Sequence, residues 1–440
     1  MSHTVSVSAH YLSCSRDRVT TTLMVICLAI PFAILLTVAA GAQTFYSRYQ
    51  NPTTELMGEG VYLIYAGIAV VLTVVPTLSM SGAVARLGLS RRVRDLAVMR
   101  LLGVSSAEVK RASLIDTLRI AAVAMAVGTL IYLVTFPLWQ FAQFQEAYLT
   151  VSQMWIGLPL FALCVVVTVV IVAFSAWIAL KPLTISALGV ARQQDRLGVS
   201  KIWALAIVVC LVAWFVLSKV VMGLGIAIAV SVGLVMLAIF FALVNLLGVL
   251  VISLGGRIMV ALARRPSTLL AARRIMDNPR AQWRSYGGIT LVAFIVATMV
   301  PVFSMLSVDT QTAADVAMFH DVYLGMMIVF AFTFALGAVS TLANQSARIL
   351  DSAKQLQALI HLGAGTRDLD RARRWEVYIP MVLTVIAAFI AGLFFSAPVA
   401  IGAIRPAGIV PALGLLVAGV TIVALAGEAT RWWQKQVLRG

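Results

Sequence analysis

Apolar residues dominate long stretches of the 440-residue chain, and polar positions gather in the intervals between them. A helix that crosses a bilayer needs about 20 mostly apolar residues, and ten stretches meet this length. The predicted spans cover residues 20–42, 61–83, 115–136, 154–180, 202–218, 225–254, 286–307, 322–343, 376–398 and 408–428. The first apolar run is too long for a typical signal peptide, so we expect it to stay uncleaved. The pattern predicts an all-α polytopic membrane protein with ten transmembrane helices.

Composition and charge further restrict the class of protein and its orientation in the membrane. Hydrophobic residues make up 61% of the chain and charged residues 11%, which excludes a soluble enzyme, a nucleic-acid-binding domain and a disordered chain. The formal charge is +16, and an N-terminus inside the cell leaves only Arg48, Lys219 and Arg405 as basic residues in outer loops. The positive-inside rule then predicts a multi-pass protein of the cell (plasma or inner) membrane with both termini cytoplasmic. Loop topology explains the charge without a nucleic-acid partner.

Two long cytoplasmic segments contain an internal repeat at an offset of 260 residues. Residues 94–116 read RDLAVMRLLGVSSAEVKRASLID, and residues 354–376 read KQLQALIHLGAGTRDLDRARRWE. Each copy lies between the second and third span of a four-span set. The repeat therefore predicts three parts, which are a four-helix half over 1–200, a two-helix insert over 201–255 and a second four-helix half over 256–440.

Each copy predicts a short amphipathic helix, at about 91–103 and about 351–363. A glycine ends this helix, a hydroxyl residue can cap the next one, and an acid follows in its first turn. One copy alone would suit a helix lying on lipid headgroups, whereas two matched copies favour docking to a symmetric cytoplasmic partner. The candidate docking residues are Arg94, Leu96, Met99, Arg100, Leu102, Gly103, Ser105 and Glu108 in the first copy, and Lys354, Leu356, Leu359, Leu362, Gly363 and Asp368 in the second.

At these residues the chain resembles the FtsX-like permease family, the membrane subunits of MacB-type (type VII) ABC transporters. The family pattern combines an L-x-x-[LM]-[RK]-x-[LI]-G core, a capped polar turn and an acid entering the third helix. The first copy matches it well, and the second has Ile360 where the family usually has Arg or Lys. The stretch KPLTISAL at 181–188 resembles the family's tail after the fourth helix. The stretch LLAARRIMDNPRAQWR at 269–284 resembles its basic amphipathic helix before a half's first span.

The resemblance implies two FtsX-like four-helix repeats around a two-helix insert, a BceB-like 4+2+4 arrangement, here without a large extracellular domain. It also implies that each repeated segment is a coupling helix in a groove of an ATPase subunit. The chain has no G-x-x-x-x-G-K-[ST] P-loop, so ATP and Mg would belong to a partner chain. We expect a transport subunit that is not an enzyme, has no cofactor of its own and binds two ABC ATPase copies. A permease homodimer, with four docking helices for two ATPases, stays open.

The expected activity is the movement or extraction of an amphipathic or lipid-like compound, a class that includes antimicrobial peptides, drugs and haem. A permease without an external domain most easily handles a substrate already dissolved among membrane lipids. Asn245, His320 and Met326 are weak candidates for substrate contact, since methionine more often fills a core. The six acids of the outer loops, Asp321 among them, are weak candidates as well, and the four histidines form no metal-ligand spacing. Two alternatives are an ion-coupled secondary transporter and a non-transporting FtsX-like signalling or scaffold subunit.

Overall fold

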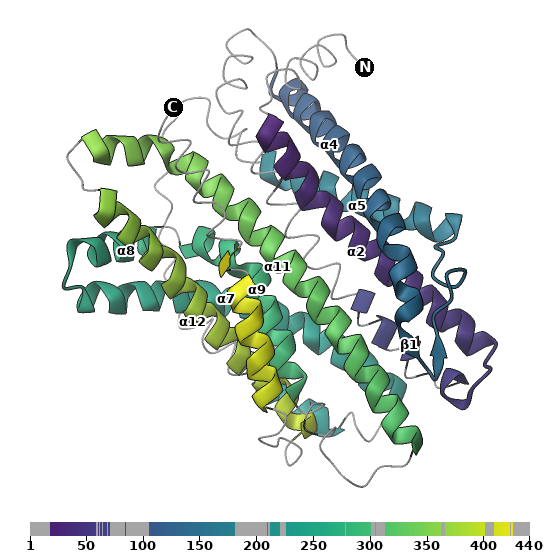
Figure 1. The fold of residues 1–440 in the computed structure, drawn as a ribbon. Coiled ribbons are helices and arrows are strands. Elements are labelled where there is room, and N and C mark those ends of the chain that lie inside the picture. The colour runs from purple at the N-terminus through teal and green to yellow at the C-terminus, as the bar shows by residue number, and fades with distance from the viewer. Residues whose placement is uncertain are drawn as a thin grey trace. The chain divides into compact units, whose positions relative to one another are not determined.

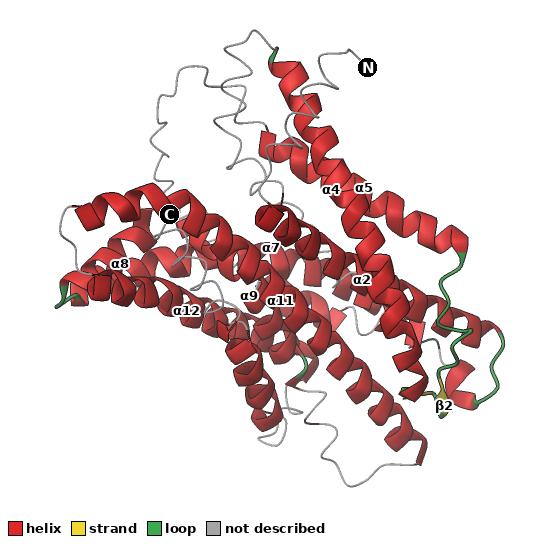
Figure 2. Ribbon diagram, turned by 45° about the horizontal axis from the view of Figure 1, so that its top comes forward, coloured by secondary structure: helices red, strands yellow, loops and turns green. Residues whose placement is uncertain are grey.

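Nearly all described residues of the computed structural model are helical, and one short hairpin interrupts them (Figure 2). The structure describes residues 18–58, 60, 62–63, 65–67, 69–70, 84, 105–180, 209, 212–220, 226–277, 279–300, 304, 313–361, 366–400, 409–422 and 424–425. The chain divides into two compact units. Unit 1 is Met1–Arg192 with Ala313–Gly325, and unit 2 is Gln193–Thr312 with Met326–Gly440.

In the described part of unit 1, three long helices pack together ahead of α11 (Ala313–His361). Helix α2 (Arg18–Gln50) packs against α4 (Ser106–Thr135), and α4 packs against α5 (Leu158–Leu180), as Figure 1 shows. A short 3₁₀ helix, η1 (Glu55–Gly58), follows α2, and another, η2 (Phe136–Phe141), follows α4. The hairpin of β1 (Gln143–Phe144) and β2 (Ala147–Tyr148) then leads towards α5.

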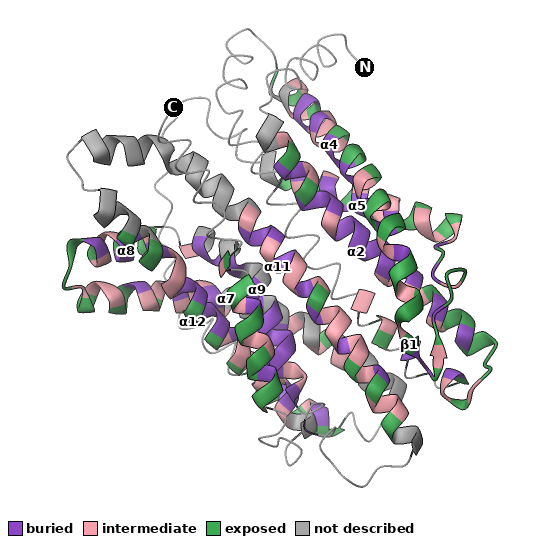
Figure 3. Ribbon diagram, viewed as in Figure 1, coloured by how far each residue is buried: buried purple, intermediate pink, exposed green. Residues whose placement is uncertain are grey.

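The α2–α4 crossing forms the core of unit 1. Most of α2 is buried (Figure 3), and Cys27, Phe32 and Leu36 are completely so. Gly128 of α4 permits the close approach, because a methyl group there would lie 2.6 Å from the carbonyl oxygen of Ala29. Small residues at a crossing let two backbones come together, which is the usual basis of helix association in membranes.

Helix α5 turns a continuous apolar stripe outward. The stripe consists of Leu163, Val166, Val170, Phe174 and Trp177, and each of these side chains is more than half exposed. Their spacing of three and four residues places them on one side of the helix. A soluble protein rarely exposes such a patch, so this side of α5 suits lipid.

Unit 2 contains α7 (Ile226–Leu262), α8 (Pro266–Asp277), α9 (Pro279–Thr298) and α12 (Thr366–Ala400). Helix α9 is largely buried and packs most extensively against α12, which also contacts α7 and α8. Gly392 of α12 lies against the backbone of Phe294, and a methyl group there would stand 2.8 Å from the Cβ of Ala297. As in unit 1, the first and third spans of a predicted half cross at a glycine.

Aromatic rings attach the predicted two-helix insert to α12. Trp214 lies in the helical residues 212–220 and stacks on Phe395 with ring centroids 4.9 Å apart, while its Nε1 donates a hydrogen bond to the Phe395 carbonyl at 2.9 Å. Phe240 of α7 meets both rings edge-on. Buried aromatic pairs of this kind contribute about 0.5–1.5 kcal/mol each beyond their area, so the insert packs firmly within unit 2.

Helix α11 (Ala313–His361) runs unbroken for 49 residues. We expected a span ending near 343 and a separate amphipathic helix starting near 351, and the structure instead joins them. The cause is visible in the sequence NQSARILDSAKQLQALI at 344–360, which contains neither Gly nor Pro and therefore nothing that stops a helix. Residues 351–361 of the predicted second coupling helix thus form the last part of α11, and 362–363 lie outside the described residues.

Five described helices are long and apolar enough to cross a membrane: Thr21–Gln50, Lys110–Phe141, Leu158–Ile178, Val316–Leu342 and Arg374–Ala397. They correspond to the first, third, fourth, eighth and ninth predicted spans. Two shorter apolar helices overlap two further predicted spans, Leu247–Leu262 the end of the sixth and Ile409–Ile422 the tenth. The total of ten spans and the three-part division stay predictions, because much of the remaining spans lies outside the described residues.

Candidate functional site

The last turn of α2 carries a buried arginine that binds the neighbouring connection. Arg48 is 3% exposed, and its guanidinium donates hydrogen bonds to the carbonyl oxygens of Phe144 at 2.8 Å and Tyr148 at 2.9 Å. It also donates to Oε1 of Gln153 at 2.9 Å. An arginine can serve several acceptors at once because its donors form a rigid planar fork. Arg48 therefore fastens the hairpin between α4 and α5 to the end of α2.

The hairpin has an unusual turn. Its strands pair Gln143 with Tyr148 and Phe144 with Ala147, which leaves Gln145 and Glu146 as the two turn residues. Both have positive φ angles, 58° and 62°, the left-handed region that a type I′ turn requires and that Asn and Gly usually supply. Gln145 is completely buried, so hydrogen bonds from its surroundings must hold the turn in place.

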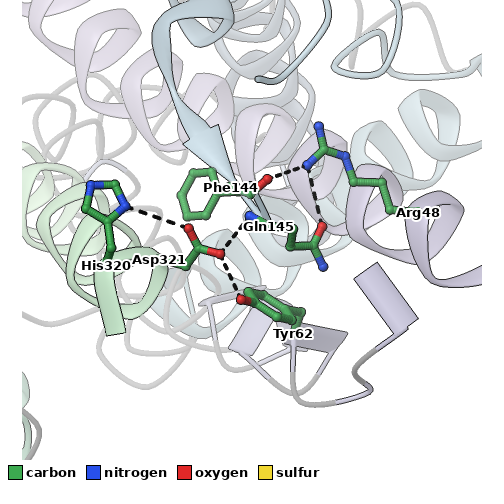
Figure 4. Close-up of polar contacts among 6 residues, drawn as sticks. All are labelled: Arg48, Tyr62, Phe144, Gln145, His320 and Asp321. Atoms are coloured by element: carbon green, nitrogen blue, oxygen red, sulfur yellow. Dashed lines mark hydrogen bonds and ion pairs between the residues drawn. The ribbon is translucent and has the colours of Figure 1, made fainter. Parts of the chain in front are cut away.

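Asp321 of α11 supplies one of these hydrogen bonds. Its Oδ2 accepts from the backbone N–H of Gln145 and from the hydroxyl of Tyr62, each at 2.7 Å (Figure 4). The Asp321 side chain is buried, whereas the neighbouring His320 is exposed, with Nδ1 3.9 Å from Oδ1 of Asp321. The Asp321 cluster, defined as Arg48, Tyr62, Phe144, Gln145, His320 and Asp321, thus draws on four segments of unit 1 that are distant in sequence.

The polar groups of the Asp321 cluster hold segments of the chain together. The donors and acceptors around Gln145 bind one another, and the hydroxyl of Thr54 also donates to the Gln145 carbonyl at 3.1 Å. Among the described residues, no group of three or more His, Cys, Asp or Glu side chains could hold a metal ion. The arrangement fixes the predicted outer ends of α2 and α11 to one hairpin.

The three candidate substrate residues occupy different settings. His320 belongs to the Asp321 cluster and faces outward. Met326 is buried within α11, as expected of a packing residue. Asn245 lies in α7, at a position whose side chain is outside the described part of the structure.

The first copy of the repeat is described only from Ser105 onward, so six of its candidate residues lie outside the described residues: Arg94, Leu96, Met99, Arg100, Leu102 and Gly103. Ser105 has extended backbone geometry and caps α4. The Glu108 backbone N–H donates to Ser105 Oγ at 3.3 Å, and the Ser105 backbone N–H donates to Glu108 Oε2 at 3.2 Å. This reciprocal pair is a capping box, and it confirms the predicted cap and its acid.

In the second copy, the structure shows the backbone of most candidate residues. Lys354, Leu356 and Leu359 lie in α11, and Asp368 lies in the first turn of α12, which begins at Thr366. The side chains of these four are not described, and Leu362 and Gly363 lie outside the described residues altogether.

Two pairs of positions related by the 260-residue offset are buried in both copies of the repeat. Ala112 and Ala372 are completely buried, and the acids Asp116 and Glu376 are both buried one turn later. Glu376 Oε1 accepts from Gln282 Nε2 at 3.2 Å, and its Oε2 lies 3.6 Å from Nη1 of Arg274. The acid that enters α12 is therefore bound to α8 and α9 at the predicted cytoplasmic end of unit 2.

The capping box leads to a measurable expectation. Replacing Ser105 with alanine removes the acceptor for the first turn of α4 and should cost about 1 kcal/mol of local helix stability. Hydrogen exchange of the amides at 106–109 should rise several-fold, whereas Ser105→Thr, which keeps the hydroxyl, should stay close to the parent. Equal exchange in the alanine variant and the parent would show that the cap contributes nothing.

From the Asp321 cluster, sequence reasoning singles out His320 and, as an acid of an outer loop, Asp321. It gives no role to Tyr62, Gln145 or Arg48, although one signal is present: Arg48 is one of just three basic residues expected in outer loops. A basic residue that departs from the positive-inside rule and lies at the end of a membrane span is expected to have buried polar partners. Glu376 was noted as the acid entering its helix, but its partner Arg274 was not.

The described helices and the outward apolar stripe of α5 define a multi-pass helical membrane protein. Residues 67–186 match the family described as FtsX-like permease C-terminal. This segment is a little over a quarter of the chain and contains the first copy of the repeat, whereas the second copy lies beyond it. The match supports the family resemblance and indicates a permease-type membrane subunit. Comparisons with curated proteins and with solved structures gave no match.

Proposed function

We propose that the protein is the permease subunit of an ABC transporter of the MacB type, which moves or extracts an amphipathic or lipid-like compound. The observation that carries the proposal is the family match over 67–186, because this segment contains the predicted coupling residues 94–103. The capped start of α4, which directly follows the predicted coupling residues 94–103, supports the proposal, since a capped helix gives the docking residues a firm base.

A separate ATPase subunit would supply the energy. The chain lacks a P-loop, and the two copies of the repeat would give one permease chain two docking sites. ATP and Mg would bind to the ATPases, and ATP-driven closure of the pair would move the segments that precede α4 and α12. The assembly would lie in the cell membrane with its termini on the cytoplasmic side.

The surfaces that the structure exposes support the proposed substrate class. Helix α5 presents large apolar side chains outward along its length, and the connection between α4 and α5 is a tight hairpin rather than a binding domain. A compound already dissolved in the bilayer could reach such helices without capture from water. Antimicrobial peptides, drugs and haem are candidates of this kind.

The test is a pull-down of the tagged protein from detergent, read by mass spectrometry and an ATPase assay. We expect a P-loop ATPase at about two copies per chain. Leu96→Asp with Leu356→Asp should reduce its recovery at least tenfold, because a charge in an apolar docking face costs more than 1.4 kcal/mol. The control is Leu197→Asp, which lies in a predicted cytoplasmic segment outside both copies.

A protein that purifies without a nucleotide-binding partner, yet transports when an ion gradient is imposed, would overturn the proposal. It would favour the ion-coupled transporter, for which Asp321, a buried acid in the candidate span Val316–Leu342, would become the first residue to examine. Recovery of the ATPase without any transport would favour the signalling subunit.

A further inference from the structure

Helix α8 is fixed in unit 2 by one of its two sides. Ser267, Ala271 and Ile275, spaced by four residues, are almost completely buried, and α8 packs against α7 and α12. The contact with α7 is close at Gly256, where a methyl group would stand 2.8 Å from Cγ of Met276 and 3.4 Å from Cγ2 of Ile275.

A charged pair strengthens this attachment. Arg274 of α8 lies 3.6 Å from Glu376 of α12, and Gln282 of α9 donates to the same carboxylate. The Glu376 side chain is only 12% exposed, so water screens the pair less than it would at a free surface. The orientation of α8 around its axis is therefore set, and its other side must face away from unit 2.

That outward side carries basic and apolar residues together. Leu269, Arg273 and Met276 follow one another at spacings of four and three residues and so share one side of α8, with Met276 at the edge that meets Gly256 of α7. Arg265 lies in the bend directly before the helix. Leu269 is 38% and Met276 39% exposed, and both Arg265 and Arg273 are exposed. The α8 surface is defined here as Arg264, Arg265, Leu269, Arg273 and Met276.

The charges on this surface are nearly all of one sign. Asp277, in the last turn, is the only acid in the α8 sequence. Two large apolar side chains are exposed close by in the sequence or beside a residue that contacts α8: Leu262 at the end of α7, two residues before Arg264, and Trp375 of α12, next to Glu376, at 73% and 42% exposure. Tryptophan is enriched where a membrane meets water, because its ring is apolar and its N–H is polar.

We propose that the α8 surface binds the headgroups of anionic lipids, with Arg265 and Arg273 contacting phosphate. Leucine and methionine would enter the boundary of the acyl chains, while the arginines extend to the headgroups. The predicted topology places α8 on the cytoplasmic side, where the leaflet is negatively charged. Alternation of exposed apolar and basic residues on one helix suits a lipid interface better than a protein groove. The inference does not depend on the proposed transport activity.

The experiment measures lipid retained by the full-length protein. Delipidated protein in detergent is mixed with equal amounts of phosphatidylglycerol and phosphatidylcholine, and bound lipid is counted by native mass spectrometry. We expect the parent to retain phosphatidylglycerol in preference. Arg265→Gln and Arg273→Gln should each weaken that preference about fivefold, which corresponds to roughly 1 kcal/mol per basic residue at an anionic surface.

Two control variants sharpen the result. Arg119→Gln removes an exposed arginine from α4 in unit 1 and should leave the preference unchanged, whereas Arg265→Lys with Arg273→Lys keeps both charges and should retain most of it. An equal loss in Arg119→Gln would show a diffuse charge effect and overturn the assignment to α8. An unchanged lipid preference in both Arg265→Gln and Arg273→Gln would also overturn it, whether or not an ATPase is still bound.

Discussion

Replacing Arg48 with methionine is expected to lower the stability of the protein more than any other single change to the Asp321 cluster. The substitution keeps much of the side-chain volume but leaves the carbonyls of Phe144 and Tyr148 and the amide of Gln153 without their donor. Buried groups stripped of a charged partner typically cost about 3–5 kcal/mol. The apparent unfolding temperature in detergent should fall by several degrees.

The matched control is Arg119→Met, because Arg119 is exposed on α4 and should tolerate the change within about 0.5 kcal/mol. Asp321→Asn should fall between the two, since a carbonyl oxygen can still accept from Tyr62 and from the Gln145 backbone. If Arg48→Met melted at the same temperature as Arg119→Met, the hairpin would not depend on the guanidinium.

Adding a single methyl group at either helix crossing is the second change with a large expected effect. Gly128→Ala and Gly392→Ala would place Cβ against the backbones of Ala29 and Phe294, which cannot rotate away as a side chain could. The helices would have to separate, and overpacking of this kind costs about 1–3 kcal/mol. Thermal unfolding in detergent measures the loss.

The same substitution at glycines with open surroundings provides the control. Gly41 in α2 and Gly414 in the helix at 409–422 have no atom within 4 Å of an added methyl. There, alanine should be neutral or stabilising by up to about 1 kcal/mol, because it lowers the entropy of the unfolded chain and favours helix. A loss at Gly41 and Gly414 as large as that at Gly128 and Gly392 would contradict the role of close approach.

The sequence is informative wherever local rules decide the structure. Long apolar runs predicted the five described candidate spans, because a bilayer requires that length of helix. The Ser105-x-x-Glu108 spacing predicted a helix start, and the capping box is present. Both signals are contained in fewer than thirty consecutive residues and do not depend on tertiary contacts.

The Asp321 cluster could not be predicted in the same way. Its members come from positions 48, 62, 144–145 and 320–321 and meet only after the chain folds. The sequence does not predict the Gln145–Glu146 turn either, since neither residue is the Asn or Gly that is typical of a type I′ hairpin. The unbroken α11 differs from the prediction for another reason: the fall in hydropathy after 343 indicates the end of a span, but no Gly or Pro stops the helix there.

Helix α11 is long enough to extend well beyond the membrane and so to act as a lever arm. At a rise of 1.5 Å per residue, α11 is about 74 Å long, more than twice the roughly 30 Å of hydrocarbon in a bilayer. The residues from 343 to 361 extend about 28 Å past the apolar window Val316–Leu342. A tilt of only about 5° around the end of that window would move the tip of this arm by about 2 Å. A small change in the tilt of this one membrane helix would thus displace the segment where a partner is proposed to dock by ångströms.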